Sequence, residues 1–291
     1  MERGLGFALI ATIGFGTTLV MGTLIARMMH PLVFSFLVTG ATFAALSIVL
    51  AATGKPFETR KLLTVHRKDF LQLLLTRGIV GGVLITFAFS LTIGIRAAFL
   101  PLVEPLFVTL VSVVAAKEHI SAKKCVLLLA LVFGGYLFVT SGAFIFDQLT
   151  LGDLLLVAAI AFFSLSYLPT SRLSKKAGPL SVIALMNGLS ALFYGVVAVP
   201  FFGSLAALSL ADYAFLGVFI FLGPLAGVLL WFSSLKTVKP WVTASMMTLQ
   251  SIVGGLLAFF WLGQTLFGMQ LVGALVMLVS VFFIAQENKK R

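Results

Sequence analysis

Long runs of apolar residues, separated by short polar turns, dominate the chain. A transmembrane helix needs roughly 20 mainly apolar residues, because each residue rises about 1.5 Å and the hydrocarbon core is about 30 Å thick. Ten segments meet this requirement, so the pattern predicts ten transmembrane helices. They cover residues 5–26, 32–52, 70–93, 97–116, 123–143, 150–171, 180–202, 212–235, 241–262 and 266–285.

The composition excludes a soluble domain. Hydrophobic residues make up 60% of the 291 residues and charged residues only 10%, whereas a soluble domain carries about 25% charged residues. The longest polar interruption, residues 53–69, is too short to form a domain of its own. We therefore expect an all-α integral membrane protein.

The basic residues indicate the orientation of the chain. Its 20 Lys and Arg residues and 9 Asp and Glu residues give a net charge of +11, which in a soluble protein would suggest a nucleic-acid partner. Here the basic residues lie between the apolar runs. If the N-terminus is cytoplasmic, seventeen of the 20 lie on the cytoplasmic side, in agreement with the positive-inside rule. We predict a cytoplasmic (inner) membrane protein with both termini in the cytoplasm and no nucleic-acid partner.

The two halves of the chain, residues 1–146 and 147–291, share a pattern of motifs. Three pairs recur in the same order at an offset of 145 to 148 residues. Glu104 and Glu118 correspond to Gln250 and Gln264 in the second half. Pro31-Leu32 and Gly40 correspond to Pro179-Leu180 and Gly188, and Gly78 and Gly82 correspond to Gly223 and Gly227. Because each half holds five spans, an odd number, the second half enters the membrane from the opposite side. The pattern thus predicts two inverted five-helix repeats, as in many alternating-access transporters.

Several stretches also resemble the drug/metabolite transporter superfamily, EamA type. They are residues 102–107 (LVEPLF), 116–121 (AKEHIS), 151–155 (LGDLL) and 230–236 (LWFSSLK). The resemblance covers essentially the whole chain and implies a carrier of amino acids, nucleotide-like metabolites or drugs. The sequence departs from the family pattern at Lys117, commonly Gly, and at Gln250-Ser251 and Gln264, where the second half often keeps Glu-Pro and Glu. The missing acid weakens any mechanism that needs two symmetric carboxylates.

Glu104 is the strongest candidate for a substrate or proton site. It lies about 10 Å into the fourth span by helical rise, where a carboxylate is costly unless it is paired, protonated or hydrated. Pro105, with Pro101 one turn earlier, leaves backbone carbonyls without donors and predicts a kink. The alternative is a fixed polar contact with a neighbouring helix.

Arg77 is the second charged candidate. It lies about 12 Å from Asp69 by helical rise within the third span. Its side chain either snorkels to the interface or faces a central cavity, where it would neutralise Glu104 or bind an anionic group of the substrate.

Uncharged residues within the spans complete the candidate site. Asn187, Gln250 and Ser251 could bind a ligand or join helices by hydrogen bonds. Tyr167 and Trp231 could form cavity walls or fill space between helices. Trp241 and Trp261 lie near span ends, where anchoring at the headgroup level is expected.

Glycine and proline residues suggest packing and hinge positions. The small residues Gly78, Gly82, Gly223 and Gly227 allow close helix contacts that would permit rocking. Pro101, Pro105 and Pro224 are the corresponding kink or hinge candidates.

Signals of an enzyme are missing from the sequence. His30, His66 and His119 lie in separate loops, and neither a His-Glu-x-x-His motif nor a Gly-Lys-Ser/Thr phosphate loop occurs. Cys125 is the single cysteine, so neither a disulfide nor a thiolate metal site can form within the chain. We expect no enzymatic activity, metal or cofactor.

These features together predict a secondary transporter for a small metabolite. We expect alternating access around a cavity formed mainly by spans three, four, six, eight and nine, with Glu104 as the candidate for proton coupling. The expected partners are a small-molecule substrate and the lipid bilayer, and the protein would be a monomer or homodimer. A channel or a sensor or scaffold is the alternative.

Overall fold

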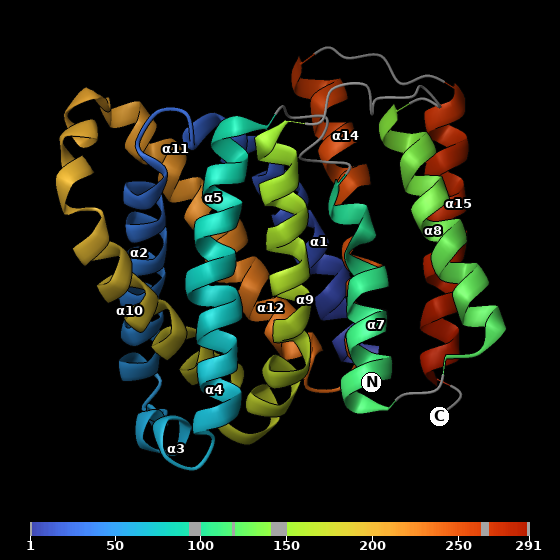
Figure 1. The fold of residues 1–291 in the computed structure, drawn as a ribbon, viewed down its shortest axis with the longest axis horizontal. Coiled ribbons are helices and arrows are strands. Elements are labelled where there is room, and N and C mark those ends of the chain that lie inside the picture. The colour runs from blue at the N-terminus through green and yellow to red at the C-terminus, as the bar shows by residue number, and fades with distance from the viewer. Residues whose placement is uncertain (1, 93–99, 118–119, 141–149, 263–267, 290–291) are drawn as a thin grey trace.

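The computed structural model describes residues 2–92, 100–117, 120–140, 150–262 and 268–289, and these residues form only helices and turns. Seven of the described helical segments are long and apolar enough to cross a membrane, and residues 100–116 form a shorter apolar helix. The chain is therefore an all-helical, multi-pass membrane protein. The helices, drawn in Figure 1, are α1 (Glu2–Ile25), α2 (Pro31–Ala52), α3 (Thr59–Leu63), α4 (Arg67–Leu73), η1 (Leu74–Val80), α5 (Gly81–Leu91), η2 (Leu100–Val103), α7 (Glu104–Ala116), α8 (Ala122–Thr140), α9 (Leu151–Ala177), α10 (Pro179–Val197), η3 (Val199–Ala207), α11 (Leu210–Ile220), η4 (Phe221–Gly227), α12 (Val228–Ser234), α13 (Pro240–Met247), α14 (Gln250–Leu262) and α15 (Gly268–Lys289).

Helix ends follow the local sequence. Proline occupies the first turn of α2, α10 and α13, where its missing N–H removes no intrahelical bond. The predicted seventh span, 180–202, is too long, because α10 ends at Val197 and the 3-10 helix η3 follows. The predicted sixth span, 150–171, is too short, since α9 continues to Ala177 and passes through Pro169.

Two crossings contain a π-helical turn in their middle. The segment η1 lies between α4 and α5, and η4, of the same length, lies between α11 and α12 and begins 147 residues later. In η1 the N–H of Gly81 donates to the carbonyl of Thr76, five residues earlier. Two carbonyls of this wider turn accept hydrogen bonds from outside the helix. The Tyr194 hydroxyl lies 2.9 Å from the carbonyl oxygens of both Gly78 and Ile79.

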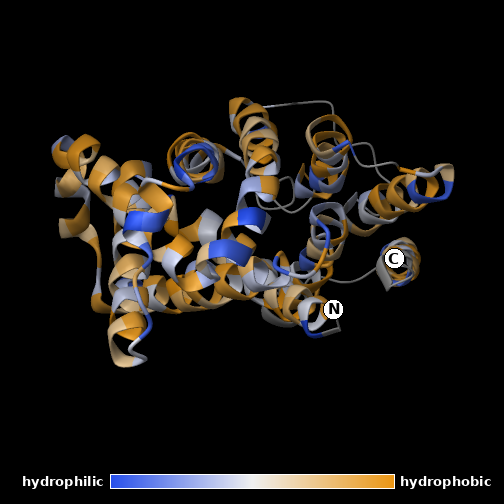
Figure 2. Cartoon of the chain, turned by 90° about the horizontal axis from the view of Figure 1, so that it is seen from below, coloured by the Kyte–Doolittle hydropathy of each residue, from blue (hydrophilic) through white to orange (hydrophobic). Residues whose placement is uncertain are grey.

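The helices pack side by side with their axes roughly aligned (Figure 1). The main contacts join α2 to α10, α8 to α15, α5 to α9, α7 to α13, and α1 to α14, η4 and α12. The chain begins and ends on one face, called here the terminal face, which also carries α3 (Figure 1). Viewed from this face, the helices are mostly hydrophobic and the hydrophilic residues gather at their ends (Figure 2).

Candidate functional site

A cavity of about 280 Å³ lies inside the bundle. Six of the seven predicted substrate-site residues line it, and so do five of the seven predicted packing or hinge residues. These lining residues are Glu104, Arg77, Gln250, Asn187, Tyr167, Trp231, Pro101, Gly78, Gly82, Gly223 and Pro224. The fold therefore gathers residues far apart in the sequence around one cavity.

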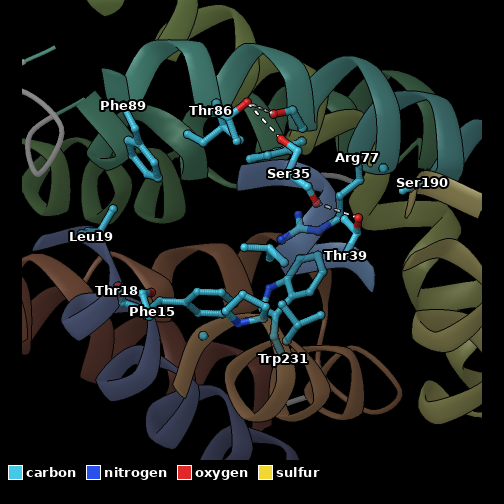
Figure 3. Close-up of a pocket in the computed structure, with 18 of the residues that line it drawn as sticks. Phe15, Thr18, Leu19, Ser35, Thr39, Arg77, Thr86, Phe89, Ser190 and Trp231 are labelled. Carbon is cyan, nitrogen blue, oxygen red and sulfur yellow. Dashed lines mark hydrogen bonds between the residues drawn. The ribbon is translucent and has the colours of Figure 1, made fainter. Parts of the chain in front are cut away.

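Arg77 faces this cavity rather than the membrane interface. It lies on the π-helical turn η1, and its guanidinium carbon is 4.2 Å from the centre of the Trp231 ring and 4.8 Å from that of Phe163. Figure 3 shows the Arg77 side chain reaching into the cavity. An arginine held against aromatic rings keeps its N–H groups available for a ligand. This geometry gives no support to the snorkelling alternative.

Glu104 opens the helix α7, directly after the 3-10 turn η2. Pro105 follows it within the first helical turn and is buried, while Pro101 lies in η2 and lines the cavity. The predicted kink is therefore a change of helix type. It brings the carboxylate to the cavity, where it interacts electrostatically with Arg77 and Tyr167.

Aromatic packing holds the residues around these charges. The rings of Tyr167 and Trp231 meet edge to face, with centres 4.8 Å apart, and each side chain is 1% exposed. Such a pair is rigid. It fixes the Trp231 surface on which the Arg77 guanidinium rests.

The uncharged candidates have different surroundings. The Asn187 side chain lines the cavity, and its amide nitrogen donates to the carbonyl of Ile183 at 2.9 Å. Gln250 begins α14 after the break that follows α13, and it lines the cavity. Ser251 is 1% exposed and lies next to Gln250 but outside the cavity lining.

The predicted packing residues lie at tight contacts. A side chain at Gly78 would collide with Ser190, one at Gly82 with Tyr194, and one at Gly223 with Thr18. Gly227 lies outside the cavity lining, close to the carbonyl of Leu222. These glycines let α1 and α10 approach the two π-helical crossings closely.

The prediction for Trp241 was wrong. Its side chain is 1% exposed, and the ammonium group of Lys124 lies 5.2 Å from the ring centre. Since α13 packs against α7 and α15, this helix end is enclosed by protein rather than by headgroups. The side chain of Trp261, and the residues Glu118 and Gln264, lie outside the described parts of the chain.

Sequence reasoning missed the contributions of α1 and α2 to the cavity. Thr18 comes from α1, and Ser35 and Thr39 come from α2. Ser35 and Thr39 are four residues apart and so share one helix face, and the Thr39 hydroxyl donates to the Ser35 carbonyl at 2.7 Å. This pair of hydroxyl-bearing residues in an otherwise apolar span was the sequence feature that could have indicated the contribution of α2 to the cavity.

Among the described residues, no three His, Cys, Asp or Glu side chains are grouped closely enough to hold a metal ion.

Comparisons with known proteins agree with this architecture. A solved crystal structure superposes on the chain with a TM-score of 0.72 at 15% identity, covering 96% of this chain and 97% of the other, which supports the fold alone. An uncharacterized transporter of Methanothermobacter thermautotrophicus is 23% identical over 99% of this chain and 88% of its own length. The model of the EamA-like transporter family matches residues 2–141 and again residues 150–286. The chain therefore belongs to the EamA-like transporter family.

Proposed function

We propose that this membrane transporter is a secondary carrier, which moves a small metabolite across the cytoplasmic membrane by alternating access. The observation that carries the proposal is the cavity inside the bundle, which holds Arg77 and Glu104 together with polar and aromatic side chains. Charged groups are costly inside a membrane and usually mark a substrate or ion pathway.

The packing pattern supports two inverted five-helix halves. If the crossings are counted as ten, the pairs α2 with α10 and α8 with α15 each join equivalent helices of the two halves. An exchange of the two halves would map α5 onto α12 and α9 onto α1. The helices α5 and α9 are in contact, and so are α12 and α1. The π-helical turns η1 and η4 also occupy equivalent crossings. This arrangement favours ten crossings, which would place both termini on the same side of the membrane, and the positive-inside rule makes that side the cytoplasm.

We infer that the side of the cavity toward the terminal face is closed in this state, because the helices there pack against one another. There α7 packs against α13 and α9. Ser112, Thr170 and Ser174, on α7 and α9, are 0% exposed, and their hydroxyl oxygens have no hydrogen-bond partner among the described residues. Buried hydroxyl groups normally have a hydrogen-bond partner. We therefore expect the contact between α7 and α9 to open to water in the alternate state of the cycle.

A thermal-shift screen of the purified protein against amino acids, nucleosides and S-adenosyl compounds would identify a ligand for transport assays. We expect saturable counterflow of that ligand in proteoliposomes, as a carrier requires, whereas a pore would give none. Proton coupling through Glu104 predicts that flux depends on an imposed pH gradient and that Glu104→Gln removes this dependence. Flux that is indifferent to both would leave only facilitated diffusion.

A further inference from the structure

The segment that joins α2 to α4 carries a surplus of positive charge. Residues 55–69, together with residues 172–176 at the end of α9, contain eight basic and two acidic residues. Both acids are paired, because the Glu58 carboxylate lies 3.8 Å from the Lys61 ammonium group and the Asp69 carboxylate lies 3.2 Å from the Arg172 guanidinium. The other six basic side chains are exposed and form no ion pair within the described parts of the chain. They are Lys55, Arg60, Arg67, Lys68, Lys175 and Lys176.

Hydrogen bonds to α9 and α10 hold this segment against the bundle. The Lys61 ammonium group donates to the carbonyl of Lys176 at 2.7 Å, and the Ser181 hydroxyl donates to the carbonyl of Pro56 at 3.2 Å. Leu62 is 0% exposed and anchors α3. Figure 1 shows α3 at the terminal face, below the ends of α2 and α4. The basic side chains therefore project from a fixed surface rather than from a free loop.

Apolar side chains lie among these basic residues. Phe57 is 39% exposed and Val65 is 72% exposed, although both belong to a polar connection. They line a surface hollow together with Arg60, Lys61 and Thr64. Apolar and basic side chains that are mixed in this way suit the bilayer interface, where the apolar groups enter the acyl-chain boundary and the basic groups stay among the headgroups.

The helix α4 shows where the membrane boundary lies. Arg67, Leu71 and Leu75 follow one another at intervals of four residues and so lie on about the same side of the crossing. Leu71 is 38% exposed and Leu75 is 52% exposed, as expected for side chains that face acyl chains. The exposed Arg67 begins α4 only about 6 Å from Leu71 by helical rise. Its guanidinium is therefore at the level of the lipid headgroups.

We propose that the hollow beside α3 is a binding site for one anionic phospholipid of the leaflet at the terminal face. The lipid phosphate binds Arg60 and Arg67, and the first part of an acyl chain packs on Phe57 and Val65. Arginine suits this role because its planar N–H groups match the oxygens of a phosphate. The surplus of positive charge favours a headgroup with a net negative charge over a zwitterionic one. This site lies outside the central cavity and does not depend on the proposed carrier function.

A fluorophore in the hollow measures the lipid preference on the full-length protein. It is attached to Val65→Cys in a Cys125→Ser background, which removes the exposed native cysteine. The protein is placed in phosphatidylcholine nanodiscs that contain increasing fractions of phosphatidylglycerol or phosphatidylcholine with a nitroxide quencher near the headgroup end of the acyl chain. We expect half-maximal quenching at an at least about 10-fold lower fraction of the phosphatidylglycerol. Equal quenching by the two lipids would overturn the proposal.

Two pairs of charge variants separate a local site from the overall charge of the terminal face. Each basic residue near an anionic lipid surface strengthens binding by about 5-fold. Arg60→Gln combined with Arg67→Gln should therefore remove most of the preference for phosphatidylglycerol. Lys117→Gln combined with Lys236→Gln removes the same charge from exposed positions after α7 and α12 and should keep the preference. An equal loss in both pairs would assign the preference to net charge and refute the site.

Two further controls test the position of the site and the need for a whole lipid. A fluorophore on Val199→Cys, 62% exposed at the opposite end of α10, should show no preference between the two lipids. The same preference there as at residue 65 would contradict a site at α3. Glycerol 3-phosphate, which has the phosphate but no acyl chain, should not reverse the quenching at residue 65. Reversal at a concentration equal to that of the lipid would show that the hollow takes free phosphate and would refute lipid binding.

Discussion

The contact between Arg77 and Trp231 gives the sharpest test of the cavity geometry. The guanidinium carbon lies 4.2 Å from the ring centre, and Trp231 is 1% exposed. A cation–π contact contributes about 0.5–1 kcal/mol at an exposed site and about 2 kcal/mol or more when desolvated. For this half-buried arginine we expect a coupling energy of about 1–2 kcal/mol.

A double-mutant cycle of Arg77→Met and Trp231→Leu isolates that energy. Each single change also alters packing, but the cycle cancels these separate costs. One kcal/mol corresponds to about 2–4 °C in the melting temperature of a chain of this size. The double variant should therefore melt about 2–8 °C higher than the sum of the single effects predicts, in detergent-based thermal unfolding.

The control cycle pairs Trp231→Leu with Arg60→Met. Arg60 is exposed on the helix α3, outside the cavity lining. Residues that share no partners should give additive effects, within about 0.3–0.5 kcal/mol. Additivity in the Arg77 cycle as well would show that the guanidinium does not rest on the Trp231 ring. The position of the Arg77 side chain in the cavity, as described above, would then be incorrect.

Three further predictions follow from other parts of the fold. Gly273→Leu should lower the melting temperature by several degrees, because its Cβ would collide with the backbone of Gly134 and Phe138 where α8 crosses α15. The control Gly268→Ala, where a side chain meets open space, should change the melting temperature little. Equal melting temperatures of the two variants would contradict this close crossing. In a Cys125→Ser background, Ser174→Cys should react with N-ethylmaleimide at least about 10-fold faster than the equally buried Leu173→Cys. The reason is that only Ser174 lies at the contact between α7 and α9 that we propose to open. Equal rates would argue against opening there. Burial against Phe201, whose ring stacks 3.7 Å away, lowers the pKa of His30, so the neutral form is favoured in the fold and thermal stability should fall as the pH drops below about 6.5. This fall should be smaller in His30→Gln, and an identical pH profile would exclude His30 as its cause.

The charged part of the site was predictable because charge in an apolar span is conspicuous. Arg77 and Glu104 stand out in long apolar segments, and the cost of burying them indicates a shared polar space. Aromatic rings hold the guanidinium of Arg77, and its role, to neutralise Glu104 or to bind an anionic group of the substrate, stays a prediction. Which ring an arginine meets depends on how distant helices pack, and no local pattern encodes it.

The hydroxyl-bearing helices escaped prediction for a different reason. Threonine and serine in a helix satisfy themselves by bonding to a carbonyl three or four residues earlier, as Thr39 does with Ser35. In the sequence they therefore resemble ordinary apolar-span residues. The π-helical turn η1 was equally hidden, because the hydroxyl that bonds to its carbonyls belongs to Tyr194 on another helix.

The backbone and the side chains of the two proposed halves differ in symmetry. The π-helical turns and the helix breaks before Glu104 and Gln250 occur at equivalent places of the two proposed halves. In the proposed cycle, equivalent breaks would give the two alternate states similar energies. The charges, in contrast, belong to one half only, since Gln250 replaces the acid in the other. A symmetric pair of carboxylates would hold a small cation equally well from either half. One arginine and one glutamate define a direction in the cavity, so in the proposed carrier cycle the site would hold an asymmetric molecule in a single orientation while the surrounding helices exchange between states.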